Sequence, residues 1–120
     1  MVDGDEAGPI DVAHLDRQTF GDVALRAELL GLFETQCRAL LPVVEVAGEG
    51  ASEAAHSLRG AALAIGAFAV ADASGAIEES GGDRDGDAER HLRLARDVGA
   101  ALRAIRSLLN PSSRMVSPSG

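Results

Sequence analysis

The sequence contains no lysine, tryptophan or tyrosine, and aromatic residues make up only 2% of its 120 residues. Its core must therefore be built from Ala, Leu, Val and Ile, which suits packed helices better than a β-sandwich. Proline is scarce, at 4 residues. A chain of this length allows one domain and little more.

Cysteine and long apolar runs are also lacking. The single cysteine, Cys37, excludes an internal disulfide framework and is typical of a reducing compartment. No apolar run reaches the roughly 18 residues needed to span a bilayer. The acidic N-terminus has no apolar stretch of the kind found in signal peptides. We therefore expect a cytoplasmic protein, with Cys37 as a small core residue.

The charge is unbalanced, because 19 acidic residues face 11 bases, all arginine, for a net charge of −8. Residues 1–11 and 78–87 each contribute −4, so the rest of the chain is neutral overall. No basic stripe with interleaved aromatics exists, which argues against nucleic-acid binding. The acidity also argues against an anionic membrane surface.

The pattern predicts one short helix and four longer ones between residues 11 and 109. The short helix covers about 11–19, with Asp11 as its N-cap. Pro42 predicts a kink or an early stop in the second helix, and Gly66 is a natural residue to end the third. The longer helices are expected at about 22–47, at 51–65, at 68–80, and from 85–87 to 109.

Apolar residues recur at helical spacing in these segments. Short connections favour antiparallel neighbours, so the expected fold class is all-α, an antiparallel up-down-up-down four-helix bundle with a short N-terminal capping helix. Such a bundle closes its own core, so we expect a monomer. Residues 1–10 are expected to be a disordered acidic tail and residues 110–120 a flexible tail. Predicted core positions are Leu25, Leu29, Leu32, Cys37, Leu40 and Val43/Val44, then Val70, Ala73 and Ile77, then Leu92, Ala95, Val98/Gly99, Leu102, Ile105 and Leu109.

The helix over 51–65 is the most informative segment. At about 100° per residue, Leu58 marks the centre of its apolar stripe, which also contains Ala54, Ala55, Ala62 and Ile65. His56 falls about 160° away from that centre and is predicted to point to solvent. The same outer face carries Glu53, Gly60, Leu63 and Ala64, and Arg59 lies on its flank.

This outer face is unusual for a solvated helix surface. A glycine in a helix interior costs about 1 kcal/mol relative to alanine, and Gly60 next to His56 suggests clearance for an approaching molecule. Leu63 and Ala64 then form an apolar docking patch with Glu53 at its edge, and the Arg59 guanidinium could stabilise a phosphoryl group. Helical geometry alone leaves open that His56 is an ordinary surface histidine.

Other candidate sites are weaker. The three histidines show no i,i+4 pairing, so no metal site is expected. Asp83, Asp85 and Asp87 lack the full spacing of a calcium loop and are expected to be solvated charges near a helix start. No P-loop or kinase signature is present, so we expect no enzyme that uses ATP.

The run Ala55-His56-Ser57-Leu58-Arg59-Gly60-Ala61-Ala62, followed by Ile65-Gly66-Ala67, resembles the histidine phosphotransfer (HPt) family of bacterial phosphorelays. The resemblance extends over about residues 10–109 and includes the Ile77-Glu78 pair. It implies that His56 accepts a phosphoryl group on Nε2, with Leu58 as buried anchor and Gly60 as the clearance residue. Arg59 stands where lysine is commoner in the family.

The resemblance also implies the partners, which are response-regulator receiver domains and a hybrid histidine kinase. It implies no cofactor in this chain, because Mg²⁺ is held by the receiver domain. His56 would take the phosphoryl group from one receiver aspartate and relay it to another. The alternative is a non-catalytic adaptor that binds a receiver domain through the same helix face. A third possibility, a purely structural bundle, gives no reason for Gly60 and an exposed Leu63.

Overall fold

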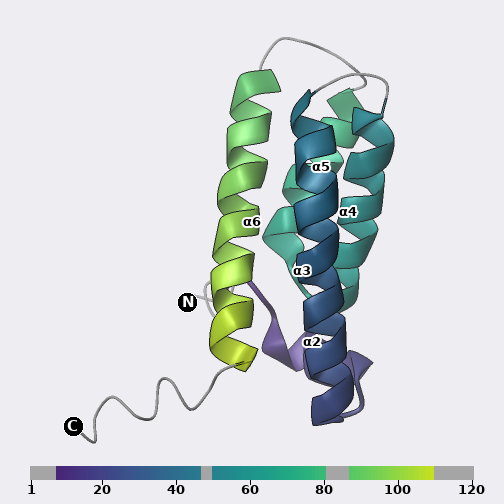
Figure 1. Ribbon diagram of the computed structural model, residues 1–120, viewed down its shortest axis with the longest axis vertical. Coiled ribbons are helices and arrows are strands. Elements are labelled where there is room, and N and C mark those ends of the chain that lie inside the picture. Colours follow the sequence, from purple (N-terminus) through teal and green to yellow (C-terminus); the bar gives the residue numbers. More distant parts are fainter. Residues whose placement is uncertain (1–7, 47–49, 81–86, 110–120) are drawn as a thin grey trace, which may run out of the picture.

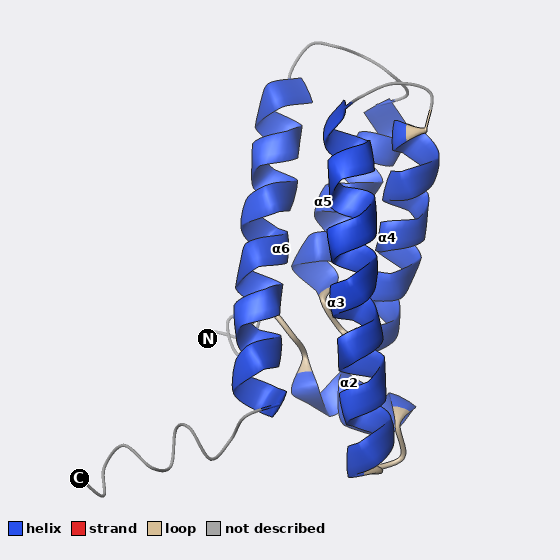
Figure 2. Ribbon diagram, in the orientation of Figure 1, coloured by secondary structure: helices blue, strands red, loops and turns tan. Residues whose placement is uncertain are grey.

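The computed structural model describes residues 8–46, 50–80 and 87–109, and these residues form five helices and no strand (Figure 2). The predicted all-α fold class is confirmed. The helices are α2 (Val12–Gln18), α3 (Val23–Val46), α4 (Ala51–Ile65), α5 (Phe68–Ser80) and α6 (Asp87–Leu109).

The four long helices alternate in direction and form an antiparallel bundle (Figure 1). Helix α4 packs against α3 and α5, and α6 closes the bundle by packing against α5 and α3. The short helix α2 lies across one end, where it contacts α4. No helix of the described residues is long and apolar enough to cross a membrane.

Helix α2 is fixed to the turn between α4 and α5. Asp11 caps α2 as predicted, because its Oδ1 accepts a hydrogen bond from the His14 backbone N–H. The Asp11 N–H donates to the Gly66 carbonyl over 2.9 Å. Gly66 ends α4 with φ of 85°, and a Cβ there would lie 2.9 Å from the Asp11 carbonyl oxygen. Only glycine suits both the left-handed backbone and this close approach.

The side chain of His14 joins the same corner from α2. Its Nε2 lies 3.0 Å from the Leu63 carbonyl oxygen in the last turn of α4. A carbonyl only accepts, so Nε2 carries the hydrogen and adds a second donor to a carbonyl that otherwise accepts a long, 3.4 Å bond from the Gly66 N–H. The His14 ring also meets the Phe68 ring edge to face, with 5.2 Å between centroids. These contacts fix where the second half of α4 lies.

The predicted core stripe of α3 is only partly right. Cys37 and Val44 are buried as expected, but Leu32 and Val43 are exposed, and the core instead holds Leu30 and Phe33. Burial raises the pKa of the Cys37 thiol to about 12, with the nearby Glu34 carboxylate adding to the rise. The thiol is therefore protonated and unreactive at neutral pH.

The predicted stripe of α6 needs a similar correction. Val98 and Ile105 are buried as expected, whereas Leu92 and Leu109 are exposed. Leu94 and Ala101 take their places in the core. The physical reason is that the buried stripe lies on a face of α6 that is rotated about the helix axis from the predicted face. Leu94, Val98, Ala101 and Ile105 follow the i, i+4, i+7, i+11 spacing of a single face, and Leu92 falls outside it.

A kink or an early stop is predicted at Pro42, and the early stop is wrong, because α3 continues through Pro42 to Val46. Proline removes one backbone hydrogen bond, to the carbonyl of Arg38, and both residues are exposed. Water can therefore satisfy the carbonyl. The tails expected over 1–10 and 110–120 fall mostly on residues outside the described ranges, although Ile10 is buried in the core. Asp83 and Asp85, and the side chain of Asp87, are also outside them.

Replacing Ser74 with alanine is expected to stabilise the fold. Ser74 is fully buried on α5, and its Oγ makes no hydrogen bond with the described residues. A buried unpaired hydroxyl costs about 1 kcal/mol or more, so the melting temperature should rise by about 4–8 °C. Thermal denaturation followed by circular dichroism measures this. Ser80→Ala is the matched control and should lower stability, because the Ser80 Oγ donates to the Ile77 carbonyl over 2.7 Å. A fall in stability for Ser74→Ala would contradict the prediction.

Candidate functional site

Helix α4 has the two faces that its sequence predicts. Ala54, Ala55, Leu58, Ala62 and Ile65 are buried against the neighbouring helices. His56 lies on the opposite face, and 67% of its side chain is exposed. These buried apolar side chains hold α4 against α3 and α5, so His56 lies on a firmly packed helix.

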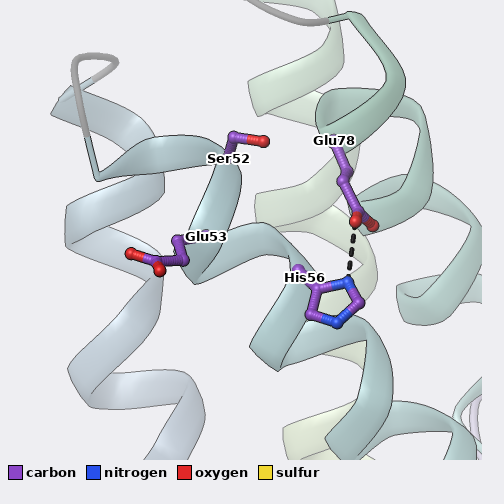
Figure 3. A pocket seen from close by; sticks show the side chains of 4 residues that line it. All are labelled: Ser52, Glu53, His56 and Glu78. Carbon is purple, nitrogen blue, oxygen red and sulfur yellow. Dashed lines mark hydrogen bonds and ion pairs between the residues drawn. The ribbon is translucent and has the colours of Figure 1, made fainter.

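The His56 imidazole is held from α5 by Glu78 (Figure 3). The His56 Nδ1 and the Glu78 Oε2 lie 2.7 Å apart, which is short for a nitrogen-to-oxygen hydrogen bond. A carboxylate only accepts hydrogen bonds, so Nδ1 carries the hydrogen. In the neutral ring this leaves the lone pair on Nε2, for which no bond is recorded among the described residues.

Together with Ser52 and Glu53, the two side chains line an open hollow of about 470 Å³ beside the first two turns of α4. Figure 3 shows His56 and Glu78 directed toward each other, while Glu53 points to the other side of α4. Ser52 lies one helical turn before His56. The hollow is therefore lined by polar side chains, open to solvent and bordered by the imidazole, so a group on a second molecule can reach the ring.

Arg59 also leans toward α5. Its Cδ and Nε lie 3.5 Å from the position that a Cβ would occupy at Gly75. The arginine stem therefore lies within van der Waals range of α5 at Gly75. Within the described part of the chain, Arg59 forms no hydrogen bond or ion pair, and its side chain is exposed. Its guanidinium therefore remains available to an anion that reaches this side of α4.

The predicted clearance and docking residues are all on the surface. A Cβ built at Gly60 meets nothing within 4 Å, so the space beside His56 is open. Leu63 and Ala64 are exposed one turn after Gly60 along α4. Glu53 is exposed about one turn before His56. The structure thus places every predicted site residue on the outer surface of one helix.

Two residues of the hollow were not singled out as site residues by their sequence pattern. Glu78 is separated from His56 by 22 positions, and only the Ile77-Glu78 pair in the family resemblance drew attention to it. Ser52 has no local signal, because a serine in the first turn of a helix is common. Among the described residues, no group of three or more His, Cys, Asp or Glu side chains could hold a metal ion.

These observations define a small antiparallel helical-bundle domain with one exposed histidine, His56, which is bound at Nδ1 by Glu78 and open at Nε2. The family model of the Hpt domain matches residues 28–108, most of the chain, and the chain belongs to this family. Hpt domains serve histidine phosphotransfer in phosphorelays, where they interact with response-regulator receivers. No curated protein and no solved structure matches the chain.

Proposed function

We propose that this protein is a phosphoryl carrier in which His56 accepts a phosphoryl group from a receiver aspartate and passes it to a second receiver. The observation that carries the proposal is the exposed His56 imidazole, bound at Nδ1 by Glu78 and open at Nε2. Membership of the Hpt family supports it. Motif and geometry therefore select the same residue.

In the transfer step, the Nε2 lone pair attacks the phosphorus of the receiver's aspartyl phosphate. The bond between phosphorus and the aspartate oxygen breaks, and the aspartate leaves as a carboxylate. The new phosphorus–nitrogen bond leaves positive charge on the ring, next to the Glu78 carboxylate at Nδ1. Positioning and charge stabilisation carry such a step, and no base in this chain has to remove a proton. Reversal on a second receiver completes the relay.

Both proteins supply positive charge that stabilises the negative charge of the phosphoryl group during transfer. The Arg59 guanidinium, unpaired in the described residues, is placed to stabilise phosphoryl oxygens from this chain. The carrier needs no cofactor of its own, because the Mg²⁺ is held by the receiver. Glu53, Leu63 and Ala64 form the surface on which the receiver docks, and Gly60 keeps the path to His56 free.

The test is transfer from a purified, phosphorylated receiver domain in the presence of Mg²⁺. The expected result is phosphate on this chain that is labile in acid and stable in base, as a phosphohistidine is. A second unphosphorylated receiver should then remove it. Binding of the receiver with no phosphate captured at any time would favour the adaptor alternative and overturn the proposal.

Glu78→Ala is expected to slow phosphoryl acceptance by His56 about 10-fold. The imidazole then loses both the bond that orients it and the negative charge beside it. Glu78→Gln should recover part of the rate, since an amide oxygen can still accept from Nδ1. Single-turnover transfer from the receiver gives the rates, and ¹⁵N NMR of the ring reports whether the Nδ1–H tautomer persists.

Glu79→Ala is the matched control for this prediction. Glu79 neighbours Glu78 on α5 but is exposed and has no recorded bond to His56. Equal rates for Glu78→Ala and Glu79→Ala, or an unchanged tautomer in Glu78→Ala, would show that Glu78 does not position the ring.

A further inference from the structure

The contact between Glu78 and His56 joins a carboxylate to a ring whose charge can change. The Glu78 Oε2 lies 2.7 Å from the His56 Nδ1, and 29% of the Glu78 side chain is exposed. Such a contact has one strength when the ring is neutral and a greater strength when the ring is a cation. The contact therefore stabilises some states of the protein more than others.

The other charged side chains near the ring do not bind it. In the part of the chain that the structure describes, only Glu78 forms a hydrogen bond or ion pair with the imidazole. Glu53 lines the hollow but points to the other side of α4 (Figure 3), and Arg59 lies one turn further on with its stem against α5. Helix α3 contributes no residue to the hollow, and α2 meets α4 in the last turn of α4.

The ring changes charge in the proposed transfer. A histidine is mostly neutral above pH 7, and here Nδ1 carries the hydrogen while Nε2 keeps the lone pair. When that lone pair forms the bond to phosphorus, Nδ1 keeps its hydrogen, so the ring becomes a cation. The receiver aspartate leaves with the electron pair of the broken bond. No other group of this chain gains or loses a proton in the step.

The Glu78 carboxylate binds the cationic ring more strongly than the neutral one. The positive charge adds a Coulomb attraction to a hydrogen bond that the neutral ring already makes. Water weakens this attraction, because 67% of the His56 side chain is exposed. For an exposed pair of this kind we expect a preference of about 5-fold for the cationic ring.

Given the proposed carrier function, we infer that Glu78 draws the transfer equilibrium toward this chain by stabilising phosphorylated His56. Glu78 is a positioning residue, because its carboxylate contacts the ring and not the phosphorus. It also keeps the hydrogen on Nδ1 of the phosphorylated ring to a higher pH. When a second receiver takes the phosphoryl group, the bond to Nε2 breaks and its electron pair returns to Nε2. The hydrogen stays on Nδ1, so the ring is neutral again.

An orienting role alone would leave the equilibrium unchanged. Orientation lowers a barrier that the forward and reverse transfers share, so it changes both rates equally. A neighbouring charge instead favours the side of the equilibrium on which the ring is a cation. Glu78→Gln separates the two roles, because an amide oxygen can still accept from Nδ1 but carries no negative charge.

The first measurement needs no receiver. Phosphoramidate phosphorylates the full chain chemically, and ¹⁵N NMR then follows the Nδ1 signal of the phosphorylated ring as the pH is raised. The wild type should lose the Nδ1 hydrogen at a pH about 0.7 units higher than Glu78→Gln, since a 5-fold preference corresponds to that shift. His56→Gln, which lacks the ring, identifies the signal.

Glu79→Gln is the matched control for this titration. Glu79 is the next residue on α5, is exposed and has no recorded bond to His56. The variant removes the same charge from the chain as Glu78→Gln does, but it leaves the contact with the ring intact. It should therefore lose the Nδ1 hydrogen at the pH of the wild type.

The second measurement is the transfer equilibrium itself. The phosphorylated chain is mixed with an equal concentration of a purified receiver domain and Mg²⁺. Near neutral pH, the ratio of phosphate on this chain to phosphate on the receiver should be about 5-fold lower for Glu78→Gln than for the wild type. The difference should shrink at alkaline pH, where the phosphorylated ring is neutral in both proteins. A merely structural role predicts no such pH dependence.

Equal titrations or equal transfer equilibria for the wild type and Glu78→Gln would overturn the inference. So would a Glu79→Gln variant that shifts as far as Glu78→Gln, because the effect would then come from net charge and not from the contact. A chain that takes phosphate on His56 from phosphoramidate but never from a receiver would contradict the carrier function alone, and the NMR titration would still decide the role of Glu78. Absence of phosphate on His56 with both donors would contradict both.

Discussion

Replacing His56 with glutamine is expected to reduce phosphoryl acceptance to background, a loss of at least about 10³-fold. Glutamine keeps a polar side chain of similar reach but offers no nucleophilic nitrogen. The side chain of His56 is mostly exposed, so the substitution should leave the bundle folded. The measurement is transfer of phosphate from a labelled receiver to the carrier, followed over time, with circular dichroism to confirm the fold.

The matched control is His91→Gln. His91 lies on α6, is half-buried and does not line the hollow beside His56. The His91→Gln variant should accept phosphate at the rate of the wild type. Acid-labile, base-stable phosphate that still appears on His56→Gln would show that another residue is the acceptor, and the assignment of His56 would fail.

The face of α4 could be predicted from sequence because one apolar stripe settles it. Ala54, Ala55, Ala62 and Ile65 cluster in one arc around Leu58, so His56 on the opposite side faces outward. The ends of this helix were also predictable, since Gly66 is the αL residue that closes it. Most of the candidate site lies on this helix, which is why sequence reasoning reached it.

Helix α3 shows where the same reasoning fails. It has apolar residues on two arcs, one centred on Phe33 and Cys37 and one containing Leu32 and Val43. The periodicity of apolar residues shows that a helix face is apolar, but it does not show which neighbouring helix covers that face. The predicted stripe mixed the two arcs, and packing against α4 and α6 decides between them.

The contacts that complete the site come from tertiary packing. Glu78 reaches His56 because the glycine turn at Gly66 folds α5 back along α4, which brings together residues 22 positions apart. Arg59 also meets α5 through this packing, and its Cδ and Nε lie 3.5 Å from the position of a Cβ at Gly75. Neither pairing follows from spacing within one helix, so neither could be derived from the α4 sequence alone.

Replacing Gly60 with glutamate is expected to slow transfer from the receiver about 100-fold or more while the fold stays intact. A Cβ at Gly60 has no neighbour within 4 Å among the described residues, so a longer side chain extends from it into the space that the receiver must enter. Glutamate also brings a negative charge close to an incoming phosphoryl group, which repels it. Phosphorylation by a small donor such as phosphoramidate needs no docking surface and should be affected far less. The comparison of the two donors therefore separates access from chemistry.

Two glycine variants serve as controls. Gly60→Ala should raise the free energy of unfolding by about 0.5–1 kcal/mol, because the helix interior prefers alanine and the space is open, and it should retain most of the transfer rate. Gly31→Glu places the same side chain in an equally open position on α3, and it should transfer at the rate of the wild type. Normal kinetics in Gly60→Glu would show that the bare backbone beside His56 is not needed for access. A helix-destabilising glycine would then stand on the exposed face without a function to account for it.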